Sequence, residues 1–174
     1  MVIISKPNKL LYDLSKSFCP IVLLNTLGKL IEKVIGERLQ FHVVSNNFIH
    51  SSQLEGLKFK LTTDVGIALM HIIRSDWTRN HLTSTLAFNI VQFFPSLNHH
   101  FLTRVIHKVG LNNHVVNFFS NYLIDRKTSY KWNSFLSPIF NINVGVGQGS
   151  ALSPILSALY LSLFLYILEK HLKT

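Results

Sequence analysis

The residues best suited to contact a phosphate group form a glycine-rich stretch, Gly145-Val-Gly-Gln-Gly-Ser150. The stretch falls between an expected strand and an expected helix, where glycines let backbone N–H groups approach a phosphate and the helix dipole adds favourable charge. It lacks the Lys-Ser/Thr ending of a P-loop and the third-glycine spacing of a dinucleotide-binding loop. A phosphate-binding loop and a plain strand-to-helix turn therefore both stay open.

A second candidate site is a short run in which basic and aromatic residues are interleaved: Arg126, Lys127, Tyr130, Lys131 and Trp132. Basic groups neutralise phosphates and aromatic faces stack on bases, so this run could contact a nucleic-acid strand. An ordinary half-exposed edge strand that carries lysine to discourage aggregation would have the same composition. Composition alone does not choose between the two.

Other common kinds of site are disfavoured. Ser150 does not lie in a G-x-S-x-G motif, which argues against a serine hydrolase. On a helix the adjacent His99 and His100 point about 100° apart, which is poor geometry for binding one metal. Cys19 is the only cysteine, so a disulfide framework and a four-cysteine zinc site are excluded. No metal site is expected from these residues.

Carboxylates are scarce, because 8 Asp and Glu stand against 17 Lys and Arg, for a formal net charge of +9. No two of these acids are neighbours in the sequence. A pI near 9.9 favours nucleic acid or anionic lipid as a partner over acidic metal chemistry. The 48% hydrophobic content excludes disorder, and the 174 residues amount to about one domain.

Helices dominate the elements that must position these residues. Apolar spacing predicts a helix over 25–44, capped by Asn25 or Thr26, and another over 62–79. The inward residues of the second are expected to be Val65, Leu69, Ile72, Ile73 and Trp77. Further helices are predicted over 95–109, which Gly110 closes, from a cap at Asn112 or Asn113 to Ile124, and from Ala151 onward.

Two segments are expected to be β structure. Thr83 to Ile90 is partly β-branched and free of Gly and Pro, which predicts a buried strand. Residues 127–133 and 139–144 flank a polar turn and predict a β-hairpin. The fold class is therefore α+β, helix-rich with a small antiparallel sheet.

The segment 151–168 contains no charged residue, and its 18 residues touch the lower limit for a bilayer span. Pro154, three serines and the lack of a preceding basic cluster favour a buried core helix. A small basic membrane-associated protein anchored by 151–168 stays open as the alternative function.

Three segments in order resemble the reverse transcriptase domain of non-long-terminal-repeat (LINE-type) retrotransposons of the sort abundant in fungal genomes. Pro20-Ile-Val-Leu-Leu-Asn-Thr-Leu-Gly-Lys-Leu-Ile-Glu-Lys-Val-Ile35, with Thr62-Thr63-Asp64, resembles the fingers. Leu86-Ala-Phe-Asn-Ile-Val-Gln-Phe-Phe-Pro-Ser-Leu-Asn-His99 resembles the first catalytic strand of the palm. Gly145-Val-Gly-Gln-Gly-Ser-Ala-Leu-Ser-Pro154 resembles the family's G-x-x-Q-G-S-x-L-S-P turn and helix. The order argues against a nucleic-acid-binding module without polymerase ancestry.

The resemblance implies part of a right-hand polymerase, with a fingers-like region over 1–82 and a partial palm over 83–174. It also implies an RNA template, a DNA primer, deoxynucleoside triphosphates and Mg²⁺, a nuclear or cytoplasmic location, and no membrane. Its expected nucleotide contacts are Gln148 with Gly147 and Gly149, the aromatic gate Phe94, and the basic residues Lys58 and Lys60.

Two departures from the family pattern concern catalysis. Asn89 stands where the family has its first catalytic aspartate, and an amide cannot bridge two cations about 3.5–4 Å apart. The later strand with two further aspartates is not reached before Thr174. We therefore expect an inactive partial copy that does not bind Mg²⁺ productively but keeps some binding of single-stranded nucleic acid. Without partner strands, the apolar faces of 83–90 and the last helix are expected to be exposed.

Overall fold

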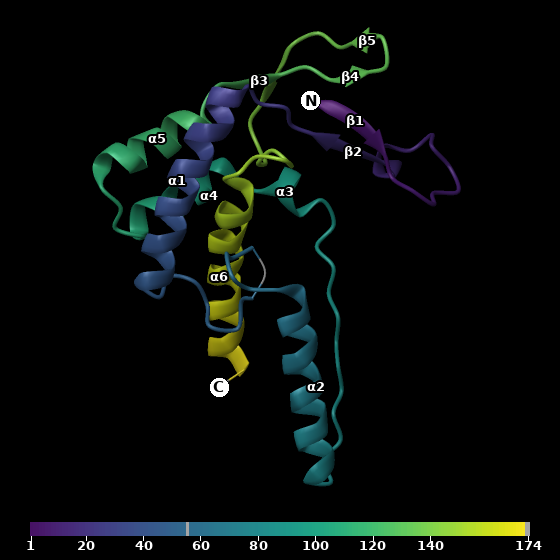
Figure 1. Ribbon diagram of the computed structural model, residues 1–174, viewed down its shortest axis with the longest axis vertical. Coiled ribbons are helices and arrows are strands. Elements are labelled where there is room, and N and C mark those ends of the chain that lie inside the picture. The colour runs from purple at the N-terminus through teal and green to yellow at the C-terminus, as the bar shows by residue number, and fades with distance from the viewer. Residues whose placement is uncertain (55, 173–174) are drawn as a thin grey trace.

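The computed structural model describes residues 1–54 and 56–172, a helix-rich α+β fold (Figure 1). Residues 173–174 of the expected palm lie outside the described residues. The helices are α1 (Thr26–Ser45), α2 (Thr62–Thr78), α3 (Phe93–Ser96), α4 (His99–Lys108), α5 (Asn113–Leu123) and α6 (Ser153–Leu172), with one 3₁₀ turn at Ser15–Ser17. The α+β fold class is confirmed.

The strands are short and form two small sheets. The first has the order β2-β1-β4-β5 and joins Phe18–Ile21, Val2–Ser5, Lys131–Trp132 and Phe135–Leu136. The second pairs β3 (Arg126–Thr128) with β6 (Phe140–Ile142) in antiparallel register, which confirms the predicted hairpin. The expectation of an antiparallel sheet was wrong in one respect, because β1 and β4 are parallel. Strands β1 and β2 were not predicted, since four residues carry too little periodicity to indicate a strand.

Helix α1 begins where its cap was expected, but only part of its apolar stripe is buried. The Asn25 side chain accepts a hydrogen bond from the Gly28 N–H at 2.6 Å. The buried residues are Glu32, Gly36, Leu39 and Val43, and Ile35 packs against the core, whereas the apolar Leu27, Leu30, Ile31 and Val34 are exposed. The apolar stripe therefore marks the inner side of α1 only in the second half of the helix.

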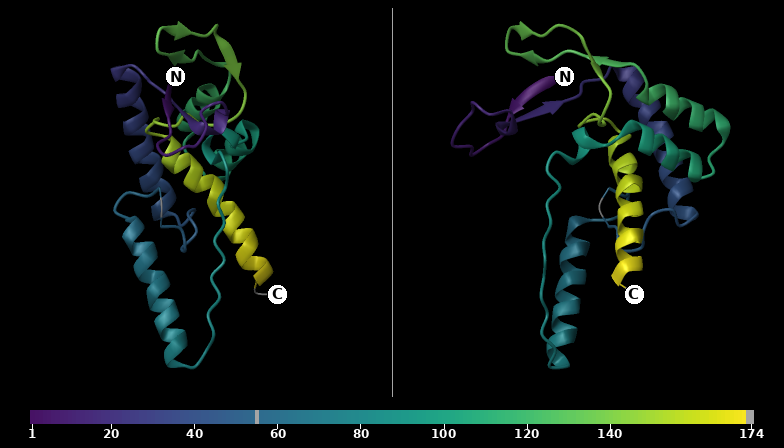
Figure 2. Two further views of the ribbon diagram at one scale, coloured as in Figure 1. Left: turned by 90° about the vertical axis from the view of Figure 1, so that its right-hand side faces the viewer. Right: turned by 180° about the vertical axis from the view of Figure 1, so that it is seen from behind.

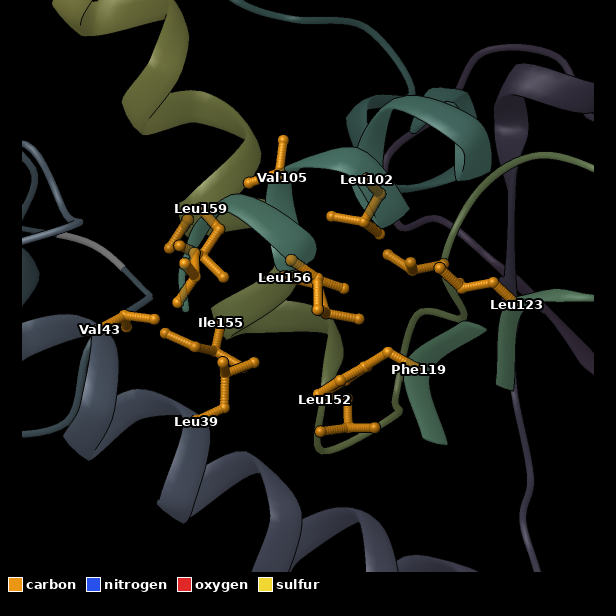
Figure 3. Close-up of a cluster of buried hydrophobic side chains, with 14 of the residues drawn as sticks. Leu39, Val43, Leu102, Val105, Phe119, Leu123, Leu152, Ile155, Leu156 and Leu159 are labelled. Carbon is orange, nitrogen blue, oxygen red and sulfur yellow. The ribbon is translucent and has the colours of Figure 1, made fainter. Parts of the chain in front are cut away.

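The hydrophobic core lies where the N-terminal half of α6 meets α1, α4 and α5 (Figure 3). Leu152, which directly precedes α6, and Leu156 and Leu159 in α6 are each at most 2% exposed. They pack with Leu39 of α1, Leu102 of α4 and Phe119 of α5, among other buried residues. This half of the uncharged segment is a core helix, as the sequence favoured.

The C-terminal half of α6 is different, because Phe164, Tyr166, Ile167 and Leu168 are exposed. By length and composition, residues 153–171 could cross a membrane, although 39% of that window is buried against the rest of the protein. The expected exposure of apolar side chains on the last helix is confirmed.

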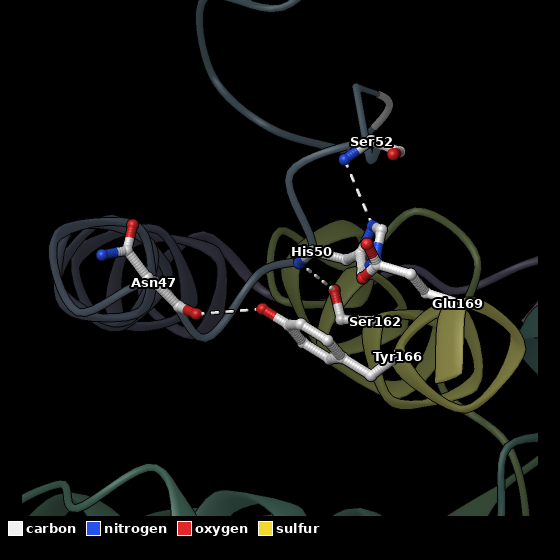
Figure 4. A network of polar contacts seen from close by, with 6 residues as sticks. All are labelled: Asn47, His50, Ser52, Ser162, Tyr166 and Glu169. Carbon is white, nitrogen blue, oxygen red and sulfur yellow. Dashed lines mark hydrogen bonds and ion pairs between the residues drawn. The ribbon is translucent and has the colours of Figure 1, made fainter. Parts of the chain in front are cut away.

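A polar network holds the loop after α1 against α6 (Figure 4). The His50 side chain is 7% exposed, and its Nε2 lies 3.0 Å from Glu169 Oε2. Its Nδ1 accepts a hydrogen bond from the Ser52 N–H at 3.2 Å, so the ring hydrogen lies on Nε2. The His50 N–H donates to Ser162 Oγ at 3.1 Å. These contacts join residues 50–52 to the second half of the helix.

The predicted buried strand over 83–90 was wrong. Residues 81–90 form no strand, and from Ser84 to Ile90 every side chain is exposed. A strand needs a partner for its backbone N–H and C=O groups. No described strand lies in either sheet next to residues 83–90. In Figures 1 and 2 the segment runs back from the far end of α2 as an extended stretch.

Two helix predictions also need correction. Helix α2 forms as predicted, but none of its residues is buried. Of the five expected to face inward, only Ile73 is half-buried. The helix predicted over 95–109 is divided into α3 and α4, because Asn98 caps α4 by accepting from the Phe101 N–H at 2.9 Å. Asn112 caps α5 in the same way, as expected.

We predict that Phe119→Ala lowers the free energy of unfolding by about 3–5 kcal/mol, because removing a buried ring leaves a cavity. Phe119 is 0% exposed, whereas Phe59, which supplies the matched control, is 90% exposed. Phe59→Ala should change stability by no more than about 0.5 kcal/mol. Urea denaturation followed by circular dichroism measures both, and equal midpoints would contradict this assignment of the core.

Candidate functional site

A buried carboxylate stands behind the glycine-rich turn. Glu32 of α1 is 3% exposed and accepts three hydrogen bonds from two other parts of the chain. The Tyr122 hydroxyl of α5 donates to its Oε1 at 2.8 Å. The Ser150 hydroxyl and the Ala151 N–H donate to its Oε2 at 2.7 and 3.0 Å. The position of this one side chain thus joins α1, α5 and the start of α6.

The charge of Glu32 is stabilised by dipoles rather than by a basic side chain. It forms no ion pair with Lys or Arg among the described residues. The carboxylate instead faces the N-terminus of α6, where free N–H groups favour negative charge. Ser150 extends this arrangement by accepting the Leu152 N–H at 3.2 Å. Among the described residues, no buried side-chain nitrogen or oxygen atom lacks a hydrogen-bond partner.

Tyr122 links the buried carboxylate to the surface. Its ring lies under the Arg126 guanidinium, 4.6 Å from ring centre to Cζ. Burial raises the pKa of the Tyr122 hydroxyl. The Arg126 charge and the hydrogen bond to Ser150 lower this pKa in part, and the Glu32 carboxylate raises it further. Tyr122 therefore stays a neutral hydrogen-bond donor, and Arg126 is held in place at the mouth of the site.

The glycines of the turn are required by close contacts. A Cβ on Gly145, whose φ is +84°, would lie 2.5 Å from the Pro95 carbonyl oxygen. A Cβ on Gly147 would lie 2.5 Å from the Val22 side chain. The turn therefore packs directly on Pro95 of α3 and on Val22, which follows β2.

Half of the amides in this turn are engaged within the protein. The Gly145 N–H donates to the Leu97 carbonyl at 2.7 Å and the Val146 N–H to the Phe94 carbonyl at 2.8 Å. The Ser150 N–H donates back to Gly147 at 3.0 Å. The N–H groups of Gly147, Gln148 and Gly149 donate to no partner among the described residues, and Gln148 and Gly149 are exposed. A structural turn and a phosphate-binding loop both remain compatible with these contacts.

A pocket of about 280 Å³ lies between this turn and the β3–β6 hairpin. It brings together four residues that the sequence assigned to two separate candidate sites: Gly147, Gln148, Arg126 and Tyr130. Gln148 is held from below, because its Oε1 accepts from Cys19 Sγ at 3.0 Å and its carbonyl accepts from the Val22 N–H at 2.8 Å. The pocket also contains the amides of Asn141 and Asn143.

Several expected site residues lie outside this pocket. Phe94 contacts the turn through its backbone carbonyl, while its half-buried ring packs against the core. Gly149, with φ of +98°, packs on Val22 instead of lining the pocket. Lys58 pairs with Glu37 of α1 at 3.2 Å, and with Lys60 it lines a separate pocket. The structure therefore does not bring Lys58 and Lys60 to Gln148.

The remaining basic and aromatic residues follow the hairpin away from the pocket. Lys127 of β3 and Lys131 of β4 are exposed. Trp132 packs against Phe18 with ring centres 5.0 Å apart and the ring planes tilted by 60°. The Lys131 N–H donates to the Met1 carbonyl at 2.8 Å, which ties the hairpin to the N-terminal strand. These residues form a basic edge next to the pocket.

Asn89 lies in the exposed extended segment and makes no hydrogen bond to the described residues. Nowhere in the described ranges do three His, Cys, Asp or Glu side chains gather in a way that could hold a metal ion. The donor set around Asn89 thus offers one neutral amide oxygen where a pair of divalent cations needs bridging carboxylates. These residues do not fit a two-metal centre.

Sequence reasoning missed the buried polar network of Glu32, Tyr122 and Ser150. One signal was present, because Glu32 interrupts the apolar stripe of α1 at the position that turns out to face the core. A carboxylate at such a position is rarely buried without partners. The partners themselves are 90 and 118 residues away in sequence, so spacing could not identify them.

One comparison with known proteins bears on these features. A sequence model for the family described as Reverse transcriptase (RNA-dependent DNA polymerase) matches residues 4–173. The match covers nearly the whole chain, and it includes α1, the glycine-rich turn and α6.

We predict that Glu32→Ala lowers the free energy of unfolding by about 3 kcal/mol or more, because it leaves buried donors without an acceptor. Glu32→Gln should cost only about 1 kcal/mol, since its amide oxygen can still accept from Ser150 and Ala151. Chemical denaturation measures both variants.

The matched control for this prediction is Glu37→Ala on the same helix. The Glu37 side chain is 53% exposed and pairs only with Lys58, so its loss should cost no more than about 1 kcal/mol. If Glu32→Ala and Glu37→Ala prove equally stable, the buried network does not hold α1, α5 and α6 together.

Proposed function

This chain belongs to the reverse transcriptase family, and we propose that it is a LINE-type domain that binds single-stranded nucleic acid without catalysing its extension. Its proposed division is a fingers-like region over 1–82 and a partial palm over 83–174. The family match makes it an RNA-directed DNA polymerase domain. The LINE-type assignment rests on the three ordered motifs, above all on Gly145-Val-Gly-Gln-Gly-Ser-Ala-Leu-Ser-Pro154.

Nucleic-acid binding is supported by one observation more than any other. The pocket between the glycine-rich turn and the hairpin joins Gln148 and Gly147 to Arg126 and Tyr130. A guanidinium, an aromatic ring and an amide are the groups that contact phosphate, base face and base edge of a single strand. The exposed Lys127 and Lys131 continue this surface along the hairpin.

Loss of catalysis is supported by Asn89. Reverse transcriptases generally use divalent metal ions, and phosphoryl transfer by two metals relies on carboxylates that bridge the ions. An asparagine supplies neither the second bridging oxygen nor the negative charge. The loss of even about 4 kcal/mol of transition-state stabilisation would slow the step roughly a thousandfold.

The alternative of a membrane-anchored basic protein is less well supported. The N-terminal half of the 151–168 segment forms the centre of the core, where Leu152 and Leu156 are both 0% exposed. Placing this half in a bilayer would require the core to come apart.

We predict that the chain binds single-stranded RNA and DNA with an affinity that falls steeply as salt is raised from about 50 to 200 mM. Lys127→Ala/Lys131→Ala should weaken binding and reduce the slope of log K against log salt by about 1.4, because each lysine releases about 0.7 counterions. Fluorescence anisotropy with labelled oligonucleotides measures both quantities.

The matched control is Lys33→Ala/Lys108→Ala, which removes two exposed lysines from α1 and α4. This double variant should bind like the unaltered chain. Equal losses in the two double variants would place binding on the whole basic surface instead of the hairpin, and binding that is weak and independent of salt would contradict the proposal.

We predict further that the chain does not extend a DNA primer on an RNA template in the presence of Mg²⁺ and deoxynucleoside triphosphates. Asn89→Asp alone should not restore extension, because the described residues contain no group of three His, Cys, Asp or Glu side chains that could hold a metal ion. Gel-based primer extension tests both. Measurable extension by the unaltered chain would overturn the inactivity claim.

A further inference from the structure

Residues 84–90 are extended but unpaired, and they end at the turn of Val91 and Gln92 that precedes α3. None of their backbone N–H or C=O groups has a hydrogen-bond partner within the described residues. Leu86, Phe88 and Val91 are 76%, 84% and 75% exposed, far more than apolar side chains in a sheet. Figure 2 shows this stretch standing apart from the body of the molecule and returning from the end of α2. Both edges of the stretch are therefore open to another strand.

The composition of this stretch is that of a strand that pairs readily. From Leu82 to Phe94 it contains no charged residue, no Gly and no Pro. Natural proteins protect exposed strand edges with charged residues and proline. Segments that lack such residues pair readily with further strands. The chain has a strongly basic surface elsewhere. At this stretch, however, no charged side chains would repel one another when two copies approach.

The sequence around Phe88 is complementary to itself in antiparallel register. If Phe88 faces Phe88 of a second copy, Leu86 faces Ile90 and Ala87 faces Asn89. One face of the resulting ribbon then carries Leu86, Phe88 and Ile90, and Ala87 and Asn89 occupy the other. Aromatic and β-branched cross-strand pairs of this kind stabilise antiparallel strands.

The exposed area of the protein is large enough for such an interface. Its accessible surface is 12811 Å² at a mass of 19.9 kDa, whereas a compact protein of that mass exposes about 8,700 Å². Stable interfaces bury about 1,200–2,000 Å² in total. Two strands alone are marginally stable, and α2, which exposes Ile67, Ile72 and Trp77 beside the stretch, offers further apolar area.

We propose that residues 86–90 of two copies of this chain pair as antiparallel strands centred on Phe88. The pairing gives the free backbone groups partners and covers the apolar side chains of the stretch. Because the two bodies both carry net positive charge, raising the salt concentration should strengthen this association. The opposite salt dependence distinguishes it from nucleic-acid binding on the hairpin.

Sedimentation velocity over a range of protein concentrations tests the proposal. The unaltered chain should form a dimer, and Phe88→Lys or Phe88→Glu should each weaken it about tenfold or more, because like charges then lie opposite each other. An equal mixture of the two variants should restore the dimer. Phe59→Lys, at a residue 90% exposed and outside this stretch, is the matched control and should dimerise normally.

Cysteine cross-linking tests the register in a Cys19→Ala background, with oxygen and a copper catalyst as the oxidant. Phe88→Cys should form a disulfide-linked dimer, because the register places residue 88 opposite itself. Thr85→Cys should not, since it lies just outside the paired strands and about 20 Å from residue 85 of the second copy. A monomeric unaltered chain, a dimer insensitive to Phe88→Lys, or equal cross-linking at both positions would overturn the proposal.

Discussion

The buried carboxylate of Glu32 is the constraint on which the arrangement of this protein depends. A charged group that is 3% exposed must find donors, and these come from Tyr122 on α5 and from Ser150 and Ala151 before α6. The start of α6 is thereby fixed relative to α1. The glycine-rich turn that precedes α6 follows from it, since its glycines must fit against Val22 and Pro95. One wall of the pocket is thus set by an interaction inside the core.

The two signs of charge have separate places and separate roles. Glu32, the one buried acid among the described residues, organises the interior, whereas the surplus of lysine and arginine lies on the surface and gives the net charge of +9. Arg126 connects the two, because its guanidinium stacks on Tyr122, which in turn donates to Glu32. The structural support of the glycine-rich turn is therefore independent of the segment around Asn89, which lies outside the core.

Elements that depend on local chemistry could be predicted from sequence. Asn25 and Asn112 cap helices as expected, and the hairpin pairs β3 with β6, because caps and turns act over a few residues. Elements that depend on distant partners could not. The stretch 83–90 has the composition of a strand but no strand beside it, and α1 turns Glu32 inward while Leu27 and Leu30 face solvent. For the site, the sequence indicated Gln148 and Arg126 separately, and it gave no sign that Lys58 would lie apart from them.

The sequence by itself determined the family, the helix-rich composition and the basic surplus, because each is a property of residue type and order. Tertiary structure alone decided which candidates meet. It placed the glycine-rich turn and the basic hairpin on either side of one pocket. It also paired Lys58 with Glu37 and left 84–90 without a partner strand. The physical reason is that burial and hydrogen bonding of a side chain depend on segments that approach it from more than a hundred residues away, as Ser150 approaches Glu32.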